Sequence, residues 1–205
     1  MPDRDAIFKR VRTSLLQSSG GAPLPDYDPS ALVAKPRLTG AGLWENFAQN
    51  FGAVSGRPMT ELGEVVSFLK SEGVSYGYCD LALCERFETV LDEIGIEIVS
   101  TYDRERYDDY QFGITRAAGA IAETGTVILT DSSTSDRLGA LTPWIHIAVL
   151  PEACLIETVG EALASFDPDE TTIIWATGPS KTADIEGILI EGVHGPGEQV
   201  CLLML

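Results

Sequence analysis

Short apolar runs alternate with amphipathic stretches through most of this chain, and the alternation limits the folds it can adopt. The runs cover residues 74–79, 96–99, 126–129, 146–150, 172–176 and 199–205. Each is short for a helix and mostly apolar, as strands buried on both faces are. The pattern predicts an α/β fold with a mostly parallel sheet covered by helices on both faces.

The amphipathic segments cover residues 43–51, 61–72, 83–94, 116–122, 157–166 and 181–191. Gly52, Gly73 and Gly95 follow three of them, where a helix ends readily because glycine takes positive φ without strain. Thr60 is the candidate N-cap of the second segment. Ligands of parallel sheets bind in the loops at the carboxyl ends of the strands, so those loops are the expected place for a site.

Residues 3–16 predict a separate basic helix. Four apolar residues share one helical stripe: Ile7, Phe8, Val11 and Leu15. Four basic residues lie mostly outside that stripe: Arg4, Lys9, Arg10 and Arg12. Residues 18–36, rich in Gly, Pro, Ser and Asp, predict a linker. We therefore expect an N-terminal helix and linker over 1–36 and an α/β domain over 37–205. The helix either packs loosely on its own domain or docks on a partner, including exchange within a homo-oligomer.

The charge of the chain excludes two classes of partner. Fourteen Lys and Arg against 31 Asp and Glu give a net charge of −17, which repels nucleic acid and anionic membrane surfaces. The sequence has no apolar run of about 18 residues, and its first twenty residues do not form a signal-peptide core. We expect a cytoplasmic protein.

The cysteines and histidines predict neither a metal site nor a cofactor site. Cys79, Cys84, Cys154 and Cys201 form no CxxC pair, so they match neither zinc nor iron–sulfur patterns. They are expected to be buried apolar residues. The two histidines are too few for most histidine-based metal sites, and no GxSxG or HExxH motif is present.

The loop over residues 177–182 (TGPSKT) is the first candidate site. If a helix begins at Ser180, its free N–H groups attract a small anion, and Lys181 adds positive charge. Asp184 and Glu186 would repel that anion while stabilising the helix. Anion binding and simple capping both remain open, because the loop is neither a Walker loop nor a GxGxxG fingerprint.

The second candidate is the junction of Glu123, Thr124 and Gly125 before a buried strand. A carboxylate there must be hydrogen-bonded or exposed in a cleft, and Gly125 allows close backbone approach. Glu123 either caps local N–H groups or takes part in chemistry.

The two histidines are weaker candidates. His194 follows the last predicted helix and either caps it or transfers a proton. His146 lies within an apolar strand and is expected to be a hydrogen-bonded sheet residue.

Two stretches, AIAETGTVIL (120–129) and ATGPSKTADIEGILIEGVHGPG (176–197), resemble the signatures of the lactate utilisation protein C (LutC/YkgG, LUD domain) family. The resemblance implies a NagB/RpiA/CoA-transferase-like fold and membership of a cytoplasmic system that oxidises L-lactate to pyruvate. The iron–sulfur clusters of that system belong to partner subunits, and this chain holds no cofactor. Similarity to CoA transferases also implies an acyl nucleophile at Glu123, although Thr124 stands where those enzymes carry Asn.

Three functional hypotheses follow. The first is a non-redox subunit that binds a small anionic ligand and acts with iron–sulfur partners. The others are a free-standing acyl-transfer or phosphosugar-type enzyme using Glu123, and an assembly module. The candidate catalytic residues are Glu123 and His194. The candidate ligand-binding residues are Thr124, Gly125, Gly178, Ser180, Lys181, Thr182 and Asp184.

Overall fold

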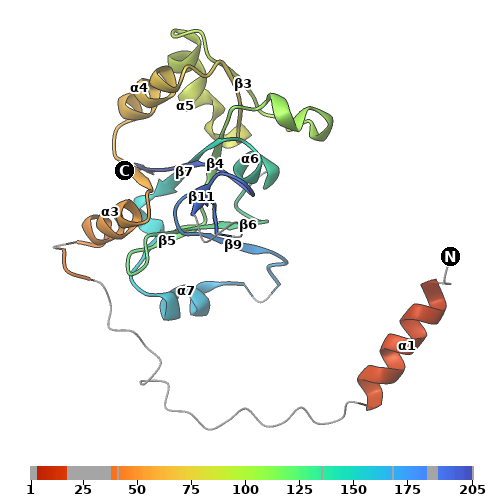
Figure 1. Cartoon of the computed structure of the whole chain (residues 1–205). Helices are drawn as coiled ribbons and strands as arrows, with labels where there is room; N and C mark the ends of the chain where they lie inside the picture. The colour runs from red at the N-terminus through yellow and green to blue at the C-terminus, as the bar shows by residue number, and fades with distance from the viewer. Residues whose placement is uncertain are drawn as a thin grey trace. The chain divides into compact units, whose positions relative to one another are not determined.

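A six-stranded parallel sheet forms the centre of the α/β part of the chain (Figure 1). The structure is a computed structural model that describes residues 4–17, 38–40, 42–134, 136–167, 169–183 and 189–204. The sheet order is β1-β12-β7-β4-β2-β3, and every neighbouring pair is parallel. Its strands are β1 (Arg57–Met59), β2 (Tyr76–Cys79), β3 (Glu97–Val99), β4 (Phe112–Arg116), β7 (Ile145–Pro151) and β12 (Glu198–Met204).

Side-chain alternation along these strands builds two cores. On β7, Ile145, Ile147 and Val149 pack with α4 (Leu62–Glu72) and α5 (Leu81–Asp92). The intervening Ala148 and Leu150 pack with α3 (Leu43–Ala53) and with the second sheet. Successive side chains of a strand point to opposite faces, so one apolar run supplies both cores. The predicted α/β class, with a mostly parallel sheet and helices on both faces, is confirmed.

A second, four-stranded sheet lies on the α3 side of the first (Figure 1). Its order is β8-β5-β6-β9, with antiparallel β5–β6 and β6–β9 pairs and a parallel β5–β8 pair. A short antiparallel pair, β10 with β11, follows β9. The strands are β5 (Gly119–Ile121), β6 (Thr126–Thr130), β8 (Leu155–Ile156), β9 (Ile173–Ala176), β10 (Lys181–Thr182) and β11 (Ile190–Glu191).

The remaining helices are short: η1 (Arg104–Asp109), α6 (Leu138–Leu141), η2 (Glu152–Cys154) and α7 (Val159–Ser165). The chain divides into two units, residues 1–35 and 36–205. Within the first unit the structure describes α1 (Arg4–Gln17), which has no buried residue. No helix of the described segments has the length and apolar character needed to cross a bilayer.

Two predicted helices are wrong. Residues 116–122 contain the last residue of β4 and the strand β5, whose backbone pairs with β6 and β8 in the four-stranded sheet. The segment predicted over 181–191 begins with β10 and ends with β11, which pair Lys181 with Glu191. Residues 184–188, including Asp184 and Glu186, lie outside the described residues. In both segments, pairing with a neighbouring strand overrides weak local helical periodicity.

The predicted helix ends are partly correct. Gly73 and Gly95 take positive φ, 69° and 78°, after α4 and α5. Helix α3 runs past Gly52 to Ala53, and Ser55 takes the positive φ of 71° instead. The N-cap of α4 is Glu61 rather than Thr60, because Glu61 and Glu64 form a capping box.

The prediction that the cysteines are buried apolar residues is correct for two of the four. Cys79 and Cys201 are buried, which raises the pKa of each thiol, whereas Cys84 and Cys154 are partly exposed. All four are free thiols. In the described part of the chain, no three His, Cys, Asp or Glu residues gather as metal ligands.

Candidate functional site

A pocket of about 270 Å³ opens where the loop after β9 meets the loop before β12. Its lining comes from both sheets, the loop at 177–180, the turn at 194–196 and α6. The polar lining residues are His146, Thr177, Ser180, His194 and Gln199. The apolar lining includes Leu129, Leu141, Ile174, Trp175, Pro179 and Pro196. The two segments singled out in the C-terminal signature, GPSKT and GVHGP, therefore border one cavity.

Backbone hydrogen bonds hold these two loops together. The Ser180 N–H donates to the Pro196 carbonyl at 2.8 Å, and the Gly192 N–H donates to the Ser180 carbonyl at 2.8 Å. Ser180 is thus fixed through its own backbone, and its side chain packs beside Gly195. His194 is exposed at the rim. The structure brings the predicted residues Gly178, Ser180 and His194 to one pocket.

His146 forms part of the pocket lining and is 1% exposed. Its Nδ1 lies 2.7 Å from Gln199 Nε2, and its Nε2 lies 2.8 Å from Thr115 Oγ1. An amide nitrogen can only donate, so Nδ1 accepts and Nε2–H donates to Thr115. Burial lowers the His146 pKa to about 4, which keeps the ring neutral at physiological pH.

The prediction that His146 is a hydrogen-bonded sheet residue is confirmed. Sequence reasoning missed that His146 and Gln199 also line the pocket. A signal was present, since each is a polar residue near the start of an apolar run. Their strands place them in register, with His146 opposite Gln199 in the β7–β12 pair.

Glu123 lies at the junction between β5 and β6, half-buried. Its Oε2 accepts a hydrogen bond of 3.1 Å from the N–H of Val159, the first residue of α7. A carboxylate at a helix N-terminus satisfies a free N–H and complements the helix dipole. The structure therefore places Glu123 in a capping position.

A chain of hydroxyl groups joins the two signature stretches. Thr124 Oγ1 lies 2.6 Å from Thr126 Oγ1, which lies 2.8 Å from Thr177 Oγ1. Thr126 is buried, whereas Thr177 reaches the pocket lining. The Glu123–Gly125 junction and the 177–180 loop are thus neighbours, linked through Thr126 and Thr177, which are 51 residues apart in the chain.

The end of α3 contacts both signature stretches, at Gly125 and at Gly178. Gly125 and Gly178 take positive φ, 65° and 75°. A Cβ on Gly125 would lie 2.2 Å from the Phe51 nitrogen, and one on Gly178 would lie 2.3 Å from the Val54 carbonyl oxygen. Each position therefore needs glycine for its backbone angle and for close approach to α3.

Lys181 does not line the pocket. Its Nζ lies 3.2 Å from the Val54 carbonyl, 3.1 Å from Ser55 Oγ and 3.1 Å from Glu191 Oε1. The ammonium group therefore ties β10 to β11 and to the end of α3. Thr182 lies on β10, and Asp184 is outside the described residues. The helix N-terminus on which the predicted anion site depended is not formed at Ser180, because Lys181 and Thr182 are a strand.

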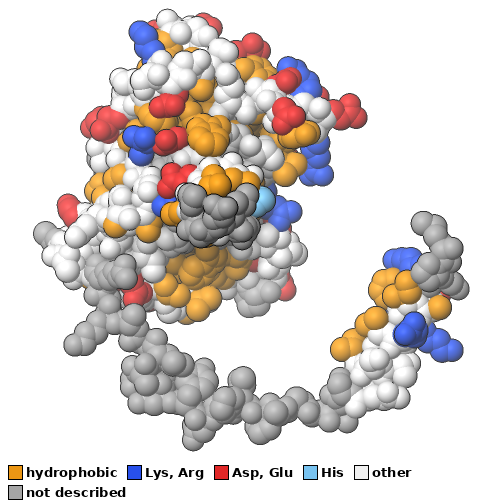
Figure 2. Space-filling model, viewed as in Figure 1, with side chains coloured by type: hydrophobic (Ala, Val, Ile, Leu, Met, Phe, Trp, Pro, Cys, Tyr) orange, Lys and Arg blue, Asp and Glu red, His pale blue; other side chains and the backbone are white. Residues whose placement is uncertain are grey.

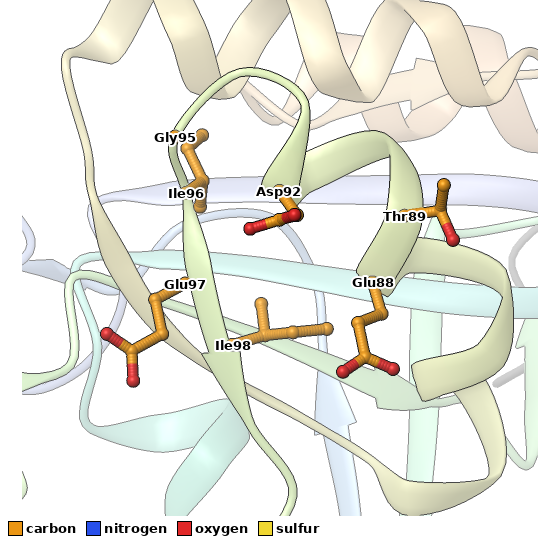
Figure 3. A pocket seen from close by; sticks show the side chains of 7 residues that line it. All are labelled: Glu88, Thr89, Asp92, Gly95, Ile96, Glu97 and Ile98. Carbon is orange, nitrogen blue, oxygen red and sulfur yellow. The ribbon is translucent and has the colours of Figure 1, made fainter.

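A larger cavity of about 650 Å³ lies between α5 and β3. Figure 3 shows the carboxylates that line it, Glu88 and Asp92 on α5 and Glu97 on β3. Three carboxylates disfavour an anionic ligand there. The pocket between the two sheets is the better candidate, because neutral polar groups and apolar walls line it.

The fold and pocket together define an α/β protein whose candidate site lies between a parallel sheet and a smaller mixed sheet. Residues 76–204 match the model of the LUD domain family, and the chain belongs to that family. The resemblance predicted from residues 120–129 and 176–197 is thereby confirmed.

Several relatives carry the name lactate utilization protein C. The protein from Bacillus licheniformis is 34% identical over 99 residues, which cover 45% of this chain and 41% of the relative. The protein from Deinococcus radiodurans is 40% identical over 87 residues, 40% of this chain and 41% of the relative. The protein from Macrococcus caseolyticus is 32% identical over 142 residues, which cover 65% of this chain and 58% of the relative.

The matched region spans about two fifths of the length of the first two relatives. Among solved structures, a DUF162 family protein from Deinococcus radiodurans aligns with a TM-score of 0.44 and 19% identity. That alignment covers 79% of this chain and 94% of the other.

Proposed function

We propose that this chain is a non-redox subunit in L-lactate utilisation and that it binds a small carboxylate in the pocket between its two sheets. The shared name of the curated relatives supports the role in lactate utilisation. The observation that carries the ligand proposal is the meeting of the GPSKT and GVHGP segments around one cavity of about 270 Å³.

The size of the pocket favours a metabolite of few heavy atoms. Sites for drug-sized ligands measure roughly 300–1,000 Å³, so this pocket is small for a nucleotide. Its walls combine hydroxyl and amide groups with Leu129, Ile174 and Pro179. Such a lining suits lactate or pyruvate, in which a carboxylate and a second oxygen stand beside a methyl group.

Neutral donors bind the carboxylate in this proposal. No lysine or arginine is found among the described residues of the lining. The Ser180 hydroxyl can donate, and a primary amide has two N–H donors, of which Gln199 gives one to His146. The neutral His146 fixes the orientation of that amide. Binding without a cationic partner is expected to be weak, with a Kd on the order of 1 mM.

The redox step belongs to iron–sulfur partner subunits in this proposal. The four cysteines stand at positions 79, 84, 154 and 201, a spacing that matches no cluster motif. The chain then contributes ligand binding and assembly. Glu123 receives no catalytic role here, since its carboxylate already accepts the N–H of Val159.

The test of the subunit role is lactate-dependent electron transfer by the host's lactate-oxidising fraction, with and without this chain. We expect the rate to fall when the chain is removed and to recover when purified protein is added. An unchanged rate in its absence would overturn the role.

The test of the site is titration of the purified chain with L-lactate and pyruvate, followed by calorimetry or NMR. Ser180→Ala should weaken binding about tenfold, the usual cost of one hydrogen bond to a charged group. Ser67→Ala is the matched control, because Ser67 is exposed on α4 and bonds the Gly63 carbonyl. Equal affinities in both variants would remove Ser180 from the site.

A further inference from the structure

Helix α1 differs in charge from the rest of the chain. It contains four basic residues and one acidic residue, a charge of +3, which leaves −20 for the remaining residues of a chain whose net charge is −17. Ile7, Phe8 and Val11 are 47%, 46% and 49% exposed. Figure 2 shows hydrophobic and basic side chains together on the surface of this helix.

The length of α1 makes its stability depend on its surroundings. Helices shorter than about 12–15 residues are marginally stable in water by themselves. Helix α1 has 14 residues and buries none of them. Burial of its apolar stripe against another surface would add stability, and its positive charge would favour an acidic surface.

An acidic, aromatic groove is present on residues 36–205. It has a volume of about 370 Å³ and is lined by Tyr107 of η1, Trp144 and the carboxylates of Glu72 and Asp108. Tyr107 and Trp144 are 51% and 52% exposed. Aromatic faces beside carboxylates are the surroundings that favour Arg and Lys side chains, through cation–π contact and ion pairing.

The indole of Trp144 is held in its exposed position. A Cβ on Gly192 would lie 2.1 Å from the Trp144 ring, and one on Gly197 would lie 2.3 Å from it. The ring therefore packs closely against Gly192 and Gly197 and also lines the groove, where it is about half exposed. A large aromatic side chain fixed in this way is typical of an interface anchor.

We propose that the groove between Tyr107 and Trp144 receives helix α1 of a second copy of this chain. The basic residues of α1 pair with Glu72 and Asp108, and its apolar stripe covers the aromatic rings. Each copy carries one helix and one groove, so an exchange between two copies forms the same contact twice and closes the assembly as a symmetric dimer. The charges of +3 and −20 supply the complementarity.

The test is the mass of the full-length chain by light scattering, over a range of concentrations at low and physiological salt. We expect a dimer that weakens with salt, because exposed ion pairs are screened. Arg10→Glu with Arg12→Glu should weaken dimerisation at least about tenfold, and so should Glu72→Lys with Asp108→Lys. All four substitutions together should restore most of the affinity. Arg86→Glu on the exposed surface of α5 is the control and should have little effect.

Three results would overturn the proposal. The first is a monomer at every concentration, and the second is a dimer that all the charge variants leave intact. The third is a monomer in which Phe8→Asp alters the fluorescence of a variant that keeps Trp144 as its sole tryptophan, because that result assigns the groove to the helix of the same chain. Circular dichroism melts of each variant establish that the α/β unit is folded.

Discussion

The six-stranded sheet and the four-stranded sheet differ in how their strands are connected along the chain. In the first, strands such as β2 and β3 are joined by an amphipathic helix, and each unit is recognisable from its own residues. In the second, β5 and β9 both pair with β6, and β9 follows β6 by more than forty residues. The helical crossover makes the β2–β3 pair readable in a local window, whereas the β6–β9 pair joins strands too far apart for any such window.

The largest expected effect contrasts glycines in the two regions. Gly125→Ala should destabilise the chain by about 3 kcal/mol or more, because a Cβ meets the α3 backbone and φ is positive. Gly73→Ala should cost only about 1 kcal/mol, since φ is also positive but no atom lies within 4 Å of the new Cβ. Urea unfolding of both variants measures the difference. Equal losses would show that α3 does not hold the junction.

The pH dependence of stability tests His146, where the parallel sheet meets the pocket. The His146 pKa is lowered to about 4 from a reference of 6.5, so the unfolded chain binds the proton more tightly. Stability from this group is complete above pH 6.5 and is lost as the pH falls from 6.5 to 4, by up to about 3 kcal/mol. His146→Gln should flatten that part of the curve. A variant with the wild-type slope would assign the slope to carboxylates instead.

Asp80 tests a contact that belongs only to the parallel-sheet region, where it joins the start of α5 to the end of β4. It is 1% exposed, caps α5 through the Ala82 N–H and pairs with Arg116 Nε at 3.0 Å. Asp80→Ala should cost about 2 kcal/mol through loss of the cap and the charged hydrogen bond. Chemical denaturation gives the value. Asp92→Ala, on the same helix, is the control and should cost less than about 0.5 kcal/mol.

Glu123 should give the smallest effect. Glu123→Gln keeps the shape of the side chain and removes the charge beside the start of α7, with an expected cost of about 0.5–1 kcal/mol. Affinity for lactate should be unchanged, because the carboxylate bonds the Val159 N–H. Stability and ligand titration are measured on the same sample. Loss of ligand binding or turnover with full stability would return Glu123 to a chemical role.

The sequence predicts several residues of the candidate site but not which other residues lie beside them. Gly178, Ser180 and His194 were selected from a loop and a turn near each other in sequence, and they do border one pocket. The expected positive charge was Lys181, which instead bonds the end of α3 and Glu191. His146 and Gln199, in separate strands, were not selected, because their proximity depends on the pairing of β7 with β12.

The sequence by itself determined the α/β class, four strands of the central sheet (β2, β3, β7 and β12), the ends of α4 and α5 before Gly73 and Gly95, and the family. These features depend on periodicity and backbone preference within a few residues of each position. The tertiary structure alone decided that residues 119–121 and 181–182 are strands and that α3 joins the two signature stretches. The physical reason is that a short segment gains more from hydrogen bonds and burial against distant partners than from its own conformational preference.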